Sequence, residues 1–234
     1  MESIHQHAYS LLLDTVGMPE IEYKAFAEYE EMSKKHEYVT EFKPTIKDKR
    51  SIAKTLAVYS AFTEGLQLFS SFAILLNFPR FGRMKGMGQI VTYSIRDESM
   101  HVEAMTKLFR EFIQENIEIW TDDFKKEIYQ ICREMVEHED KFLDLVFDMG
   151  DIEGLTKKDM YAYNRYIADR RLLQLGLKTN YDQRENPLGW IDEVMGVEHQ
   201  NFFEGRATSY MKAGLRGKQD VVNFAEINNE GIGS

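Results

Sequence analysis

Two short stretches of the chain carry residue types that bind metal ions. In each of them, Glu2-Ser-Ile-His5 and Glu98-Ser-Met-His101, a glutamate precedes a histidine by three positions. On a helix, positions three apart share one face, so both side chains of a pair can reach one ion. Glu-x-x-His used twice, with carboxylates from two further helices, is typical of di-iron and di-manganese sites in helical bundles. The ordinary alternative is a solvated helix face, where such pairs also arise by chance.

Glu64 is a further candidate because it lies on an apolar stripe. Leu68, Phe72 and Leu75 continue that stripe at helical spacing. A carboxylate in such a place needs a compensating partner. Either a metal ion or ordinary hydrogen bonds would supply it, and the residues alone leave both readings open.

The segment before His101 poses the same question, since Arg96, Asp97 and Glu98 stand in a helix that is otherwise apolar enough to be buried. Metal coordination or an internal network of salt bridges would offset the cost of burying them. Carboxylates and neutral imidazoles without a thiolate suit iron or manganese better than structural zinc or copper(I). Cys132 lies outside every candidate ligand segment.

Tyr9 follows His5 by four residues and shares its helix face. It is either an ordinary core tyrosine or a redox-active tyrosine beside the metal, shielded by apolar side chains.

These residues must be positioned by helices, because apolar residues recur with a period of about 3.6 residues along almost the whole chain. Thr121 with Asp122, and Thr156 with Asp159, are typical helix starts. We expect an all-α bundle of long helices, with a domain over 1–212 and a mobile tail over 213–234. The segment 34–50 is expected to be a loop or irregular. The expected helices cover 4–16, 20–33, 52–78, 89–112, 122–147, 156–175 and 202–212.

Composition narrows the function classes. The formal net charge of −10 argues against nucleic-acid binding, which needs a basic face. No apolar run approaches the roughly 20 residues that span a bilayer, and the first residues do not form a signal peptide. The single cysteine cannot form an internal disulfide, which fits a reducing cytoplasm. We therefore expect a cytoplasmic protein that binds neither nucleic acid nor membrane.

In combination, the motifs resemble the radical-generating small subunit of class I ribonucleotide reductase, nearly throughout the chain and in order. The matching stretches are Glu2 to Tyr9, the Glu64 helix through Phe72, Arg96 to His101, Tyr166 to Gly176, Glu185 to Trp190 and Asn201 to Tyr210.

The resemblance implies a ferritin-like bundle and a role for each matching residue. Tyr9 would bear the radical, and Asp97 would orient a ligand histidine by a hydrogen bond. Leu68 and Phe72 would help to form the dry pocket around Tyr9. The cofactor would be two iron ions, two manganese ions or one of each. The implied metal ligands are Glu2, His5, Glu64, Glu98 and His101.

The activity implied by the resemblance begins with O2 reduction at the metal centre, which oxidises Tyr9 to a neutral radical. The radical is relayed to a separate large catalytic subunit that reduces ribonucleotides to deoxyribonucleotides, and the small subunit is a homodimer. Two alternatives remain: another di-metal carboxylate enzyme, such as a hydrocarbon oxidase, desaturase or monooxygenase, and a metal-free inactive fragment.

The chain also departs from the family pattern. The family has a sixth ligand, an Asp on a helix that precedes the Glu2 helix, and we expect that ligand-bearing helix to be missing here. The tail relay tyrosine has no counterpart after Tyr210. We therefore expect an incomplete chain, either a gene fragment or a protein completed by another polypeptide. The three retained carboxylates carry fewer negative charges than the positive charges that two divalent ions bring. We therefore expect weakened metal binding and doubtful activity for the chain alone.

Overall fold

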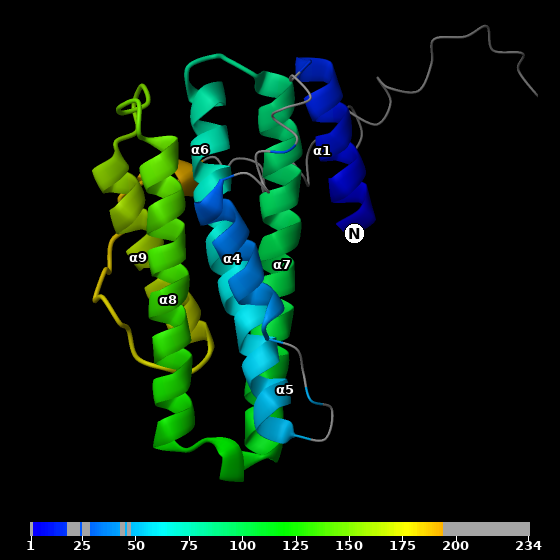
Figure 1. Ribbon diagram of the computed structural model, residues 1–234, viewed down its shortest axis with the longest axis vertical. Coiled ribbons are helices and arrows are strands. Elements are labelled where there is room, and N and C mark those ends of the chain that lie inside the picture. Colours follow the sequence, from blue (N-terminus) through cyan, green and yellow to red (C-terminus); the bar gives the residue numbers. More distant parts are fainter. Residues whose placement is uncertain (1, 18–23, 25–28, 43–44, 46–47, 194–234) are drawn as a thin grey trace, which may run out of the picture. The chain divides into compact units, whose positions relative to one another are not determined.

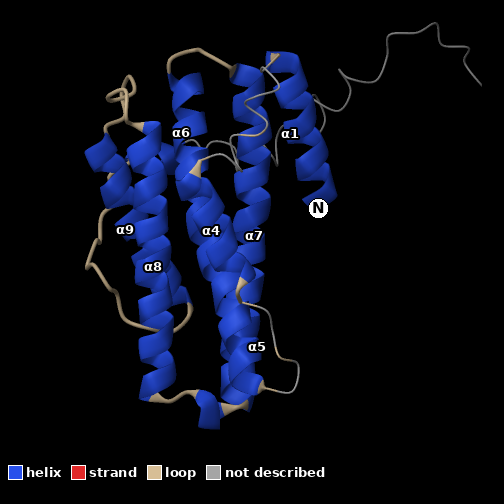
Figure 2. Ribbon diagram, viewed as in Figure 1, coloured by secondary structure: helices blue, strands red, loops and turns tan. Residues whose placement is uncertain are grey.

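The structure is a computed structural model that describes residues 2–17, 24, 29–42, 45 and 48–193. In these segments the secondary structure is helical and no strand is present (Figure 2). The all-α prediction is confirmed. The elements in chain order are α1 (Glu2–Val16), α4 (Glu30–Thr40), α5 (Lys49–Leu56), η1 (Ala57–Gln67), α6 (Leu68–Arg80), α7 (Lys85–Glu115), η2 (Ile117–Ile119), α8 (Asp122–Val146) and α9 (Lys157–Gln174).

The helix predicted over 52–78 is the combination of α5, η1 and α6, which follow one another without a break. Its middle part, η1, is π-helical. A π-helix pairs each carbonyl with the amide five residues on, and this wider turn is often found at functional sites. Because the apolar pattern of such a segment still resembles an α-helix, the sequence predicted the helix but not its π-helical middle.

The long helix α7 lies beside η1 and α6 and connects to α6 through a short turn (Figure 1). Helix α1 packs against α7. Thus the two Glu-x-x-His segments and the Glu64 helix meet, although they are far apart in sequence.

Helices α8 and α9 pack against each other and against η1. Both begin as predicted, because Thr121 Oγ1 accepts a hydrogen bond from the Phe124 amide. At α9, Thr156 and Asp159 form a reciprocal capping box.

The prediction of a loop or irregular structure over 34–50 is wrong for residues 34–40, which are helical. Helix α4 continues to Thr40, and α5 already begins at Lys49. Tyr38, Val39 and Phe42 pack toward the core from a sequence rich in charge, so the apolar face is too short to dominate the local pattern. Other expectations concern residues outside the described ones: most of the helix over 20–33, the helix over 202–212 and the tail over 213–234.

The core contains large side chains from η1, α7, α8 and α9. The largest fully buried side chains include Phe62, Leu66, Ile95, Phe109, Phe124, Met135, Met160, Tyr163 and Leu172.

A membrane-spanning helix must be both long and apolar, and none of the helices in the described part of the chain meets both conditions.

Candidate metal centre

Glu98 lies at the centre of the candidate site. Its residue is only 3% exposed, and its two carboxylate oxygens face two histidines. The Oε1 atom lies 3.3 Å from His5 Nδ1 on α1, and Oε2 lies 3.4 Å from His101 Nδ1 on α7. One buried carboxylate therefore joins the histidines of the two Glu-x-x-His motifs.

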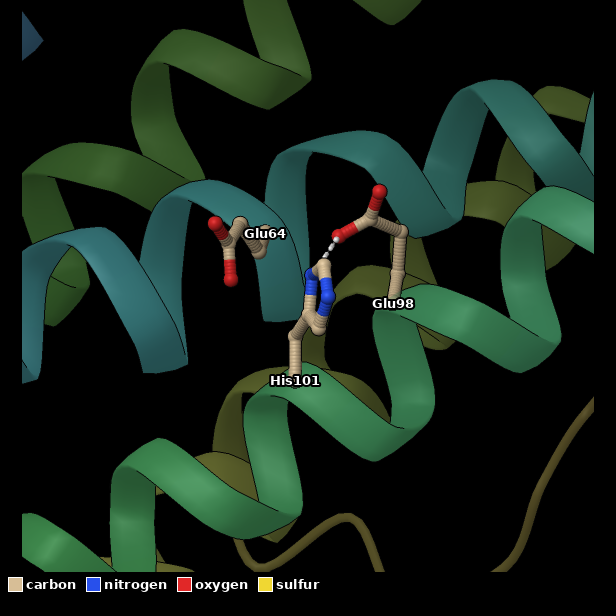
Figure 3. A group of neighbouring side chains, drawn as sticks. All are labelled: Glu64, Glu98 and His101. Carbon is tan, nitrogen blue, oxygen red and sulfur yellow. Dashed lines mark ion pairs between the residues drawn. The ribbon is translucent and has the colours of Figure 1, made fainter. Parts of the chain in front are cut away.

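Glu64 approaches the same place from η1. Glu64, Glu98 and His101 each offer one ligand atom, and these atoms all lie within 4.8 Å of one another. In Figure 3 the three side chains gather between the two neighbouring helices that carry them. Two carboxylate oxygens and an imidazole nitrogen are a donor set that suits iron or manganese. These residues form a possible carboxylate–histidine metal site.

His5 makes a second contact, since its Nε2 lies 3.2 Å from Asp97 Oδ2. A neutral imidazole carries one N–H, so it can donate to only one of two carboxylates. With the proton on Nε2 and directed at Asp97, the Nδ1 lone pair faces Glu98. A cation between Nδ1 and Glu98 would be attracted to both atoms, so the local chemistry fits a metal ligand.

Tyr9 lies on α1, one helical turn after His5. Its hydroxyl donates a hydrogen bond of 3.0 Å to Ser94 Oγ. Burial raises the pKa of Tyr9, the Ser94 contact lowers it, and the charge of Glu98 raises it further. The net rise keeps the phenol protonated and able to donate.

The remaining predicted site residues are not all equally enclosed. Phe72 is buried on α6 and packs against Phe69, with ring centroids 5.9 Å apart. Leu68 is 37% exposed. Glu2 begins α1, but its side chain lies outside the described residues.

Sequence reasoning missed two contacts of the site. Ser94 precedes Glu98 by four residues, so helical spacing alone could have placed it on the same face. The second contact joins Arg171 to the carbonyl of Gly65, 106 residues away. No local pattern signals a pairing across such a distance.

Comparisons with known proteins identify relatives of the whole chain. The family model described as ribonucleotide reductase, small chain, matches residues 1–187. The chain is 42% identical to a probable ribonucleoside-diphosphate reductase small subunit of Invertebrate iridescent virus 6, covering 92% of this chain and 70% of that one. It is 31% identical to the ribonucleoside-diphosphate reductase subunit beta of Chlamydia pneumoniae, covering 91% and 64%. The chain spans between 62% and 70% of the length of three such relatives.

Two solved structures share the fold. The ribonucleotide reductase R2 subunit from Clostridium botulinum aligns with a TM-score of 0.75 and 28% identity, covering 82% of this chain and 62% of that one. A class I ribonucleotide reductase from Bacillus halodurans aligns with a TM-score of 0.76 and 24% identity, covering 82% and 70%. The family match over most of the sequence, together with this ferritin-like helical fold, shows that the chain belongs to the ribonucleotide reductase small chain family.

Proposed function

We propose that this chain provides the di-metal site and the radical tyrosine of a ribonucleoside-diphosphate reductase small subunit. One observation carries the proposal: Glu98 faces the histidines of both Glu-x-x-His motifs while Glu64 reaches the same place from η1. Three segments distant in sequence thus direct metal-binding side chains at one point.

Glu64, Glu98 and His101 are the proposed ligands with the most direct geometric support. His5 is a proposed ligand through Nδ1, and Glu2 is proposed from the sequence pattern. Two iron ions are the proposed cofactor, and manganese would use the same donor atoms. When bound, the metal ions would activate O2, the oxidant, for a one-electron oxidation that amino-acid side chains alone cannot carry out.

The chain's own residues hold this chemistry in place. With the proton on Nε2, His5 donates a hydrogen bond to Asp97 Oδ2, and this contact would fix the ring orientation. The hydrogen bond from Tyr9 to Ser94 Oγ fixes the direction of the phenolic proton. Buried Phe72 is proposed to help exclude water from a radical at Tyr9.

The further steps are proposed to take place elsewhere. A separate large catalytic subunit is proposed to receive the radical and to reduce the ribonucleotide. The small subunit is proposed to act as a homodimer in the cytoplasm. The acidic balance of the chain argues that neither nucleic acid nor a membrane is its partner.

Metal binding is the first test. The purified chain is loaded with Fe(II) without oxygen, and the bound metal is counted. We expect iron to bind with the weakened affinity that three carboxylates predict, and we expect Glu98→Gln to lower that affinity by roughly a further 10- to 100-fold. Glu103→Gln is the matched control, because Glu103 is an exposed glutamate of the same helix. Less than about a tenth of a metal ion per wild-type chain contradicts the proposal.

Radical formation is the second test. After exposure of the iron-loaded chain to O2, electron paramagnetic resonance should show an organic radical, at a yield limited by the weakened metal binding expected of the chain alone. Tyr9→Phe should abolish this signal while iron still binds. Tyr93→Phe, which alters a 53% exposed tyrosine of α7, should leave it intact. An unchanged signal in Tyr9→Phe removes Tyr9 from the role.

A further inference from the structure

Arg171 on α9 is a buried cation beside the π-helical segment η1. It is only 8% exposed. Its Nε donates a hydrogen bond of 2.7 Å to the Gly65 carbonyl oxygen, and its Nη1 donates one of 2.9 Å to Gln174 Oε1. Both acceptors, a backbone carbonyl and a side-chain amide oxygen, are uncharged. Burial lowers the pKa of Arg171 to about 10.

Burying a charged guanidinium against neutral oxygens costs free energy, because these oxygens replace its hydration only in part. The acceptor is the carbonyl of the residue directly after Glu64, inside η1. A side chain that enters the backbone hydrogen-bond ladder of a helix changes its local path. The Arg171 contact is therefore placed where it can hold the wider π-helical turn.

Gly65 is complementary to this contact. A Cβ atom there would lie 2.7 Å from Arg171 Nε and 3.0 Å from Arg171 Cδ. Both distances are too short for a side chain to be accommodated without displacing the arginine. The absence of a side chain at position 65 is what lets the guanidinium reach the backbone.

The guanidinium also contacts the next helical turn. Its Cζ lies 4.7 Å from the centre of the Phe69 ring, a favourable cation–π distance. Phe69 in turn packs against Phe72. Arg171 therefore contacts the helix at Gly65 and again at Phe69, one turn further along.

We propose that Arg171 is a positioning residue of the metal centre, which holds the π-helical turn at Gly65 and thereby directs Glu64 toward Glu98 and His101. The inference rests on the proposed function, because it assigns Glu64 as a ligand. Arg171 acts through the backbone of η1, at the Gly65 carbonyl, and not through a direct contact with a ligand side chain.

The test compares Arg171→Met, which keeps an apolar chain of similar length, with Arg171→Lys and Arg170→Met. Arg170 is the matched control, since it is the neighbouring arginine, is exposed and stacks over Tyr166. Amide hydrogen exchange over 57–67 is measured by mass spectrometry on the metal-free chain. Cobalt(II) affinity and the visible absorption of bound cobalt(II) are measured in parallel.

We expect exchange over 57–67 to become roughly tenfold faster in Arg171→Met. Cobalt(II) should bind roughly 10- to 100-fold more weakly and with an altered spectrum. Arg171→Lys should recover part of both effects, and Arg170→Met should match the wild type. Gly65→Ala adds a Cβ that would displace the guanidinium and would also lie 3.0 Å from the Ser60 carbonyl oxygen of η1. It should reproduce the exchange effect if Arg171→Met fails to fold.

The two proposals fail in different ways. Wild-type exchange over 57–67 in both Arg171→Met and Gly65→Ala overturns the role of Arg171, whatever the metal results are. Faster exchange with unchanged cobalt(II) affinity and spectrum also overturns it, because the turn would then not position Glu64. A wild-type chain that binds no cobalt(II) contradicts the proposed function, while exchange still tests whether Arg171 holds the turn.

Discussion

Burial decides the chemistry of individual residues in this chain, and Cys132 is the simplest case. The thiol is free and fully buried. Burial raises the pKa of Cys132 to about 12, mainly because the thiolate loses its hydration. At pH 8 the reactive thiolate is therefore scarce. We expect a disulfide reagent to modify Cys132 only as fast as the protein opens.

The measurement is the rate of thiol labelling at pH 8 with increasing urea. The chain contains one cysteine, so the fully unfolded chain provides the reference of one label per molecule. Rapid complete labelling of the native chain would show that Cys132 is accessible, contrary to its burial.

Residue types and spacing predicted part of the site. The two Glu-x-x-His motifs, Glu64 and Tyr9 were candidates from sequence, and the structure brings His5, Glu98 and His101 together. Arg171 could not be predicted, because its contact depends on how α9 packs against η1. Tertiary packing of this kind leaves no local sequence signal.

A single buried ion pair between two helices can contribute strongly to the stability of the bundle. Lys35 of α4 and Glu139 of α8 form one such pair, with Nζ 2.6 Å from Oε2. The Glu139 side chain is fully buried. Removal of one partner from a buried pair leaves an uncompensated charge, which costs about 3–5 kcal/mol. We expect Lys35→Met to lower the free energy of unfolding by that amount at pH 8, as measured by urea denaturation.

The pH dependence identifies the cause. Burial raises the pKa of Glu139, and the Lys35 charge opposes that rise. In Lys35→Met the opposing charge is gone, so the carboxyl favours its protonated form more strongly. A pKa raised on folding gives stability that is present at low pH and is lost as pH rises. The deficit of Lys35→Met should thus be smaller at pH 5 than at pH 8.

Lys34→Met is the control, because Lys34 pairs with Glu30 on the surface, and surface pairs contribute little. A deficit of Lys35→Met that does not change between pH 5 and pH 8 would point to lost packing instead of the buried charge.

The helices themselves were predicted where an apolar face is long. Helices α7, α8 and α9 follow the expected segments closely, and Thr156 with Asp159 marks the start of α9. Helix α4 was misjudged, because charged residues such as Lys35 outnumber its few packed ones. The π-helical form of η1 was not predictable either, since its residues suit an α-helix equally well.

The whole described unit should respond to metal, because the site joins three segments that are separate in sequence. Helix α1 packs mainly on α7 and leaves apolar side chains such as Ile4, 69% exposed, in contact with solvent. His5 is its link to Glu98. A metal ion that binds only the folded chain at 100 times its dissociation constant adds about 2.7 kcal/mol of stability. We expect manganese(II) to raise the melting temperature and to slow amide exchange throughout α1.

His5→Ala separates the two effects. The variant retains Glu64, Glu98 and His101, so it should still bind manganese(II) and gain melting temperature, but with a smaller increase. Its α1 should gain less protection from metal than in the wild type, because of the two proposed ligands on α1 only Glu2 remains. Glu98→Gln should lose both responses, and Glu103→Gln should keep both. If metal slows α1 exchange as much in His5→Ala as in the wild type, the ion does not hold α1 through His5, and Glu2 or the packing of α1 on α7 must account for the effect.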